Sequence, residues 1–144
     1  MKANQLLGLL LALSVFASCS KSQESASTTT PSTDSFNVAN ATLIRTGTFT
    51  GNRNYSVTGS VKLYEYQGKR YIRFENFVSS DGPDLKVYIA TTTTASQFVN
   101  IGDLKSISGT QTYLVNNPPD FTQFNKVLIW CQQFSALFGS ATIQ

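Results

Sequence analysis

Two cysteines are the residues of this chain best suited to nucleophilic or redox chemistry. Cys131 follows Trp130, the only tryptophan, inside the apolar stretch VLIWCQQFSALFG, whereas Cys19 lies near the N-terminus. A thiolate can act as a nucleophile, as a redox group or as a ligand for a metal or haem. Free cysteine is also a common small core residue. The residue types alone therefore leave Cys131 open to a reactive or a structural interpretation.

The composition excludes several classes of function. Histidine is absent from the 144 residues, which removes Ser-His-Asp hydrolysis, Cys-His proteolysis and every histidine-ligated metal or haem site. No clustered acid pair is present that would suit a hydrolase. The formal net charge is +3 and the basic residues are scattered, whereas a nucleic-acid groove needs a clustered basic face. We expect no nucleic-acid partner and no classical enzyme.

Two further groups of polar residues have both a functional and a structural interpretation. Asp81 and Asp84 flank Gly-Pro in SSDGPDL, but calcium needs about 6–8 oxygen ligands and the spacing is not that of an EF-hand. A turn shaped by Pro83, with Asp81 capping backbone amides, explains them better, and we expect no metal site. Four tyrosines suggest either a sugar-binding platform or ordinary strand residues: Tyr64, Tyr66, Tyr71 and Tyr88.

The N-terminal residues have the organisation of an export signal. Lys2 precedes the apolar run Leu6–Phe16, whose 11 residues are too few for a membrane-spanning helix of about 20 residues. A basic start, a short apolar centre and small residues define a secretory signal. The run ends in FASCS, which resembles a bacterial lipobox, although Phe16 stands where Leu is usual. The resemblance implies that Cys19 becomes the lipidated first residue; the alternative is an ordinary signal peptide with a chance cysteine.

Composition then divides the chain into three parts. Residues 1–18 form the predicted lipoprotein signal peptide, and residues 19–40 form a flexible tether rich in Ser and Thr. The tether has no large apolar side chain from Ser20 to Ser35, so it cannot offset the entropy of becoming ordered. Residues 41–144 form the predicted domain. The lipid anchor would hold this domain on a membrane of the bacterial envelope, and we expect the outer membrane, on its periplasmic or surface face.

The domain is dominated by short stretches in which apolar residues alternate with polar ones, the period of a β-strand. In YSVTGSVKLYEY, Val57, Val61 and Leu63 share one face. Gly68 lies in a short polar break before the next such stretch, which predicts a hairpin. Because at least six such stretches are separated by Gly, Pro and Asn turns, we predict an all-β fold, an antiparallel β-sandwich or barrel-like single domain.

Alternation also predicts how the stretch around the second cysteine is oriented. Val127, Ile129 and Cys131 fall on one face of the NKVLIWC strand, and Leu128 and Trp130 fall on the other. If both faces are covered, this is a central strand and the cysteine belongs to a core.

A pattern of glycine, aromatic and polar residues extends over about residues 43–143, essentially the whole domain. Its members are Gly82, Pro83, Asp84, Leu85, Gly102, Leu104, Gly109, Gln111, Tyr113, Trp130, Cys131, Phe134, Phe138, Gly139 and Ala141. Together they resemble the DM-thirteen domain, a family associated with DOMON domains and proposed to take part in electron transfer.

The resemblance implies a role for Cys131, as a naked thiol or as the ligand of a bound group such as haem. The chain departs from the family in one respect, because many members carry a histidine where it has Asn54 and Tyr55. The only methionine is residue 1, so Cys131 would be the sole conventional axial ligand of a haem. The resemblance therefore leaves the cofactor unknown, with haem possible but disfavoured by the absence of histidine.

These observations lead to two hypotheses. The first is an envelope lipoprotein with an electron-transfer or redox role centred on Cys131, anchored to a membrane and paired with an envelope redox protein. It expects Cys131 to be partly accessible and to form mixed disulfides or bind a prosthetic group. The alternative is a non-catalytic binding module for an envelope protein or a glycan, in which Cys131 is structural.

Overall fold

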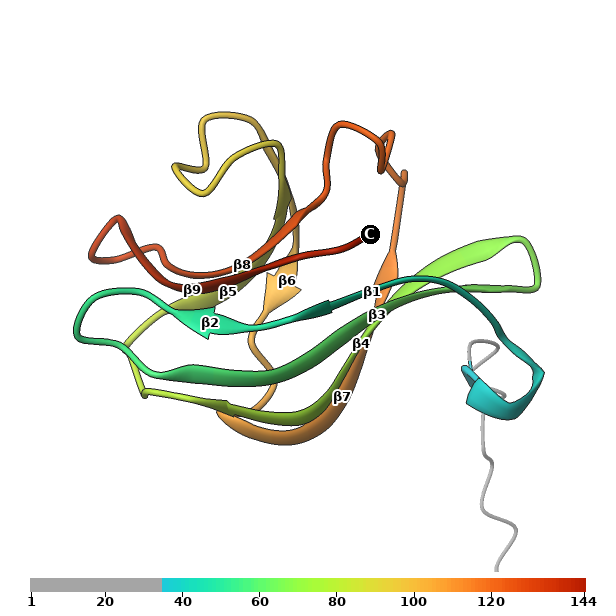
Figure 1. The fold of residues 1–144 in the computed structure, drawn as a ribbon, viewed down its shortest axis with the longest axis horizontal. Coiled ribbons are helices and arrows are strands. Elements are labelled where there is room, and N and C mark those ends of the chain that lie inside the picture. The colour runs from blue at the N-terminus through green and yellow to red at the C-terminus, as the bar shows by residue number, and fades with distance from the viewer. Residues whose placement is uncertain (1–34) are drawn as a thin grey trace, which may run out of the picture. The chain divides into compact units, whose positions relative to one another are not determined.

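The computed structural model describes residues 35–144, and the predicted signal peptide, Cys19 and most of the predicted tether lie outside the described residues. Two antiparallel sheets pack face to face (Figure 1), with strand orders β1-β3-β4-β7 and β2-β9-β8-β5-β6. This confirms the predicted all-β sandwich. Within the described residues no helix is long and apolar enough to cross a membrane. The elements are η1 (Val38–Asn40), β1 (Thr42–Thr48), β2 (Thr50–Gly51), β3 (Val57–Tyr66), β4 (Lys69–Ser79), β5 (Leu85–Ala90), β6 (Phe98–Asp103), β7 (Ser108–Val115), β8 (Lys126–Cys131) and β9 (Ala136–Thr142).

The hairpin predicted at Gly68 joins the two longest strands, β3 and β4. Gln67 and Gly68 both have positive φ, 51° and 73°, which is the conformation of a type I′ turn and matches the twist of the two strands. Leu63 pairs with Ile72 and Val61 with Phe74, and all four side chains are fully buried. The turn thus sets the register in which the apolar side chains of both strands face the second sheet.

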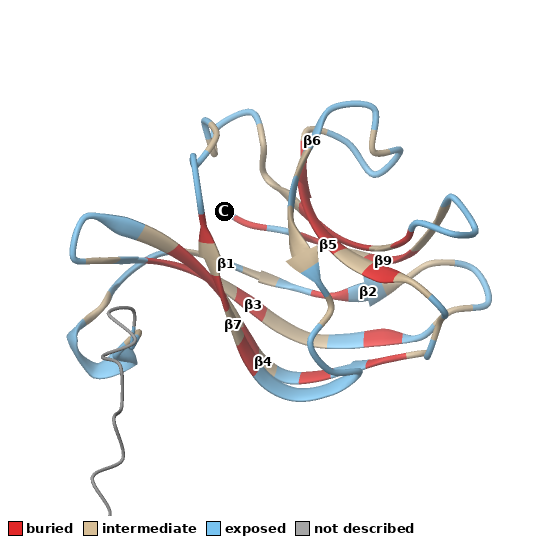
Figure 2. Ribbon diagram, turned by 180° about the vertical axis from the view of Figure 1, so that it is seen from behind, coloured by how far each residue is buried: buried red, intermediate tan, exposed pale blue. Residues whose placement is uncertain are grey.

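The core fills the space between the two sheets, and Figure 2 shows its buried segments along the strands with exposed residues in the connections. Val127, Ile129 and Cys131 belong to this core. Leu128 lies in a smaller cluster on the other side of the sheet, with Trp130 packed against that cluster. The predicted division of this strand between two faces is therefore confirmed, and both faces are covered.

The packed part of the chain extends to residues before the predicted domain start. The Phe36 ring lies 4.8 Å from that of Tyr71 and 5.5 Å from that of Tyr64. Asn37 then caps the short helix η1 by accepting a hydrogen bond from the backbone N–H of Ala39. The segment that holds Phe36 against the sheet is thus part of the folded unit, although the prediction assigned it to the tether.

Candidate functional site

Cys131 is the last residue of β8, in the middle of the five-stranded sheet. Its neighbours across the sheet are Leu85 on β5 and Ala136 on β9, and its thiol is unpaired. The residue is 0% exposed and belongs to the same core cluster as Ile129 and Phe138. The expectation that Cys131 is partly accessible is therefore wrong for the folded domain, because this strand packs its inward face against the other sheet.

Four chain segments gather at the end of the sandwich where Cys131 lies, and we call this end the loop end. They are residues 52–56, 80–84, 104–107 and 132–135. Backbone hydrogen bonds tie them to one another and to the strands: Ser80 N donates to Ser56 O at 2.7 Å, and Asn52 N donates to Phe138 O at 2.8 Å. The Gln132 N–H, directly after the cysteine, donates to Asp84 O at 2.9 Å.

The Gly-Pro segment forms the part of the loop end that pairs with the cysteine strand. Asp81 accepts a hydrogen bond from the Gly82 N–H at 2.8 Å, as the turn interpretation predicts. A Cβ on Gly82 would lie 2.9 Å from Cζ of Phe138, so only glycine fits here without moving that ring. Phe138 in turn stacks on Tyr55, with ring centroids 3.7 Å apart. The glycine therefore lets this turn close directly onto the core beside β8.

A lysine joins Asp84 of the loop end to Asp103, the last residue of β6. Lys86 Nζ lies 2.7 Å from a carboxylate oxygen of Asp84 and 2.5 Å from one of Asp103. Asp103 and Asp84 raise the pKa of this lysine by hydrogen bonding to its charged form. No group of three or more His, Cys, Asp or Glu side chains placed to hold a metal ion occurs among residues 35–144.

Gln111 and Tyr113 hold the neighbouring segment, residues 104–107. Tyr113 Oη donates to Gln111 Oε1 at 2.6 Å and accepts from the Lys105 N–H at 3.0 Å. Gln111 Nε2 donates to Ser106 O at 2.8 Å. Burial raises the pKa of Tyr113 to about 12. Both residues belong to the pattern noted in the sequence, but their hydrogen bonds to the loop that precedes β7 are visible only in the structure.

A cleft of about 320 Å³ lies between these two segments and is lined by residues 81–85 and 103–107. Leu85 connects the cleft to the thiol, because it lines the cleft and is the cross-strand partner of Cys131. Cys131 itself is not a lining residue. The folded loop end therefore presents a polar surface, and the thiol is covered beneath it.

The other predicted site residues are distributed between this end and the rest of the sheet. Gly82, Pro83 and Asp84 directly precede Leu85, the cross-strand partner of Cys131 on β8. Tyr113 binds the loop of residues 104–107 by accepting a hydrogen bond from the Lys105 N–H. Trp130 lies on the opposite face of β8, with its ring 6.3 Å from that of Tyr88. Gly109 lies on β7 opposite Phe77, with φ of 92°. Adjacent residues of a strand face opposite ways, so Trp130 and Cys131 do not form one site.

Three of the four tyrosines considered for a sugar-binding platform are buried, and Tyr66 alone is partly exposed. Tyr64, Tyr71 and Tyr88 are only 6%, 3% and 3% exposed. Phe36 covers Tyr64 and Tyr71 on the first sheet, and Phe98 stacks on Tyr88 with ring centroids 4.1 Å apart. Tyr64, Tyr71 and Tyr88 are therefore ordinary strand residues, and other parts of the chain cover their rings.

A haem does not fit the environment of Cys131. An axial ligand must face a space large enough for the macrocycle, whereas Cys131 is buried in a packed core. The chain also has no histidine, and its only methionine is residue 1. The residues of the folded domain therefore offer neither the space beside Cys131 nor a histidine or methionine as a second ligand.

The domain is an antiparallel β-sandwich with one buried thiol below a cluster of loops. The family described as electron transfer DM13 matches residues 48–143, which is two thirds of the chain. The chain belongs to this family, so the resemblance inferred from the residue pattern is confirmed, and a redox role is supported at the level of the domain. Comparison with curated proteins and with solved structures found no match.

Proposed function

We propose that this protein is a lipid-anchored electron-transfer component of the bacterial envelope and that Cys131 is its redox group. Membership of the electron transfer DM13 family supports the redox role. The FASCS sequence after a short apolar run supports lipidation at Cys19. The partner would be a redox protein of the same compartment.

The position of Cys131 at the very end of β8 is the observation that carries this proposal. The next four residues, Gln132 to Ser135, are all exposed. Ser135 has a φ of 49°, a left-handed conformation that a non-glycine residue adopts at a cost. Ends of strands beside exposed turns open at a lower free energy than the centre of a sheet. A brief opening of this turn would expose the thiol without unfolding the sandwich.

Thiol–disulfide exchange is the chemistry that such an opening permits. The exposed thiol loses its proton to solvent, and the thiolate of Cys131 attacks one sulfur of a disulfide on the envelope partner. An S–S bond forms to Cys131, the partner's S–S bond breaks, and its other sulfur leaves as a thiolate that takes up a proton. The product is a mixed disulfide.

Cys131 is the only cysteine among the described residues, so the domain has no second thiol to resolve the mixed disulfide. A dithiol donor therefore completes the transfer. One donor thiolate attacks Cys131 of the mixed disulfide and releases the second partner sulfur as a thiol. The other donor thiolate then displaces Cys131, which takes up a proton. Two electrons have passed from the dithiol to the partner disulfide, and Cys131 ends as it began.

The test uses the mature protein from its own host and oxidised glutathione as the probe. We expect intact mass to show a lipid on Cys19 and, after incubation of folded protein, one glutathione on Cys131. Cys131→Ser should give no adduct, and Cys19→Ser should leave the precursor unprocessed or released from membranes. A Cys19→Ser protein that fractionates and migrates as the wild type does would refute the lipid anchor. Unfolded protein that reacts while folded protein does not would refute the redox role of the thiol.

The second candidate function is a binding module in which Cys131 only fills the core. Its complete burial among apolar side chains favours this alternative. In that case Cys131→Ala should cost only the stability of a small cavity, and exchange with a disulfide partner should be unaffected in cells. A loss of partner reduction in the same variant would instead support the redox role.

A further inference from the structure

A groove of about 360 Å³ crosses the outer face of the four-stranded sheet, on the side away from the core. Tyr71 and Arg73 lie on β4. Their cross-strand partners, Leu114 and Thr112, lie on β7. Phe36 and Lys105 close the two ends from segments outside these strands. The residues lining the groove are Phe36, Tyr71, Arg73, Lys105, Thr112 and Leu114.

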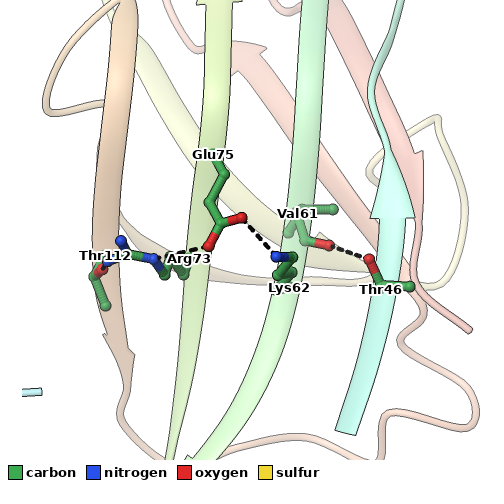
Figure 3. Close-up of polar contacts among 6 residues, drawn as sticks. All are labelled: Thr46, Val61, Lys62, Arg73, Glu75 and Thr112. Carbon is green, nitrogen blue, oxygen red and sulfur yellow. Dashed lines mark hydrogen bonds and ion pairs between the residues drawn. The ribbon is translucent and has the colours of Figure 1, made fainter. Parts of the chain in front are cut away.

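One part of the groove is positively charged. Figure 3 shows Glu75 between Lys62 and Arg73, with its carboxylate 2.6 Å from Lys62 Nζ and 3.1 Å from Arg73 Nε. The hydrogen bonds and charges of Lys62 and Arg73 lower the pKa of Glu75, so this carboxylate is ionised at neutral pH. It offsets only one of the two cations. Lys105 adds a further positive charge at the groove, and the group as a whole favours an anion.

The cations of the groove can still donate to a ligand. A guanidinium has five N–H donors, and Arg73 uses Nε toward Glu75 and one terminal nitrogen toward Thr112 Oγ1, at 3.2 Å. Lys105 Nζ donates to the Thr112 carbonyl and lies 4.8 Å from the centre of the Tyr113 ring. A lysine ammonium has three donors. An anion between Arg73 and Lys105 would therefore add hydrogen bonds to those already present.

The other part of the groove is aromatic and aliphatic. The Phe36 ring lies 4.8 Å from the Tyr71 ring at an angle of 37°, and Leu114 follows Thr112 on the same face of β7. Aromatic rings pack favourably in offset or edge-on arrangements at such separations. This part of the groove offers apolar contact to a ring, while the cations offer charge-assisted hydrogen bonds to an anionic group.

We propose that this groove binds a small amphipathic anion, a carboxylate attached to an aromatic ring. The carboxylate would lie between Arg73 and Lys105, near the Thr112 hydroxyl, and the ring would contact Phe36 and Leu114. A planar carboxylate matches the guanidinium geometry better than a spherical ion does. This inference does not depend on Cys131 or on lipidation.

The site also has a connection to the loop end. Lys105 belongs to residues 103–107, which line the cleft beside Leu85, and its backbone N–H donates to Tyr113. An anion that draws the Lys105 side chain toward Arg73 would act on the same segment. Binding in the groove should therefore change the NMR signals of residues 104–107 as well as those of β4 and β7.

The experiment is a titration of the ¹⁵N-labelled full chain with phenylacetate, followed by amide chemical shifts. Acetate, which has no ring, and benzyl alcohol, which has no charge, are the ligand controls. We expect saturable shifts around Arg73, Lys105 and Thr112 with phenylacetate and much weaker effects with either control. Affinity should fall as salt is added, because the ion pair is partly exposed.

Variants test the two halves of the groove separately. Arg73→Gln should weaken binding about tenfold or more, the value of one charge-assisted hydrogen bond, and Phe36→Ala should weaken it several-fold. Lys105→Gln, at an exposed position, should weaken binding without affecting the fold. Arg70→Gln is the matched control, since it removes a positive charge from the same strand outside the groove and should leave affinity unchanged. Equal weakening by Arg70→Gln and Lys105→Gln, or equal shifts with acetate and phenylacetate, would overturn the proposal.

Discussion

The rate at which a reagent modifies Cys131 in the native protein distinguishes a redox thiol from a structural one. Cys131 is 0% exposed, so any reagent must wait until the structure opens. Global unfolding of a small domain costs about 10 kcal/mol, within the usual range, and would slow labelling by roughly 10⁷. Opening the strand end alone would break a few hydrogen bonds, including Gln132 N–H to Asp84 O.

The local opening has a much smaller free energy. Local opening breaks on the order of three hydrogen bonds at about 1 kcal/mol each and exposes one small side chain at about 1 kcal/mol. Its free energy is therefore roughly 4 kcal/mol. Labelling would then be about 10³ slower than for an unfolded chain. We expect this smaller factor, and we expect it to change little at low urea because local opening exposes little surface.

The assay uses Ellman's reagent on the Cys19→Ser chain, in which Cys131 is the only thiol, over a series of urea concentrations. Asn52→Ala removes the side-chain hydrogen bond to Leu137 O, 3.0 Å long, and should speed labelling about fivefold by loosening the start of β9. Thr46→Val is the matched control, because its hydroxyl bonds to Val61 O on the other sheet. Labelling that follows urea with the full slope of global unfolding would refute local opening and leave Cys131 structural.

Three other predictions test the fold around the site. A chain shortened to begin at residue 41 should melt at a lower temperature than one beginning at residue 35, because it loses Phe36; equal melting temperatures would refute a contribution from its ring contacts. Gly82→Ala should cost about 1–3 kcal/mol in urea unfolding, since its Cβ would contact Phe138; no loss would show that the ring moves freely. The pKa of Tyr113 is raised to about 12, so its contribution to stability is complete below the unfolded value near 10 and is lost as pH rises through 12. Tyr113→Phe should remove this part of the alkaline stability loss, and an unchanged pH profile would contradict it.

The strands of this domain could be predicted because their signals are local. Alternation of Val61 and Leu63, then of Ile72 and Phe74, needs only the two-residue period of a strand and one apolar face. The turn is marked by Gly68, which accepts positive φ without strain, whereas the positive φ of Gln67 is seen only in the structure. The same period placed Cys131 and Trp130 on opposite faces. These inferences required no knowledge of which strands become neighbours.

The accessibility of Cys131 could not be predicted in this way, because it depends on contacts between distant segments. Burial of the thiol requires β8 to lie between β5 and β9 and its inward face to meet the other sheet. Gln111 and Tyr113 bind loop groups only five and eight residues away, but a hydropathy pattern does not indicate which polar side chains form hydrogen bonds. The ring contacts of Phe36 also cannot be predicted from a local pattern, since its partners are about thirty residues away.

The separation of Trp130 from Cys131 has a consequence for the redox proposal. The indole packs against the outer cluster around Tyr88 and Leu128, whereas the thiol belongs to the core between the sheets. Trp130 can therefore stabilise β8 from the outer face, and it does not cover the thiol. Under the redox proposal, a disulfide partner would meet residues 80–84 and 132–135, which are joined by the Gln132–Asp84 hydrogen bond. Recognition of a redox partner should consequently depend on the exposed residues of these two loops, with Trp130 acting only through stability.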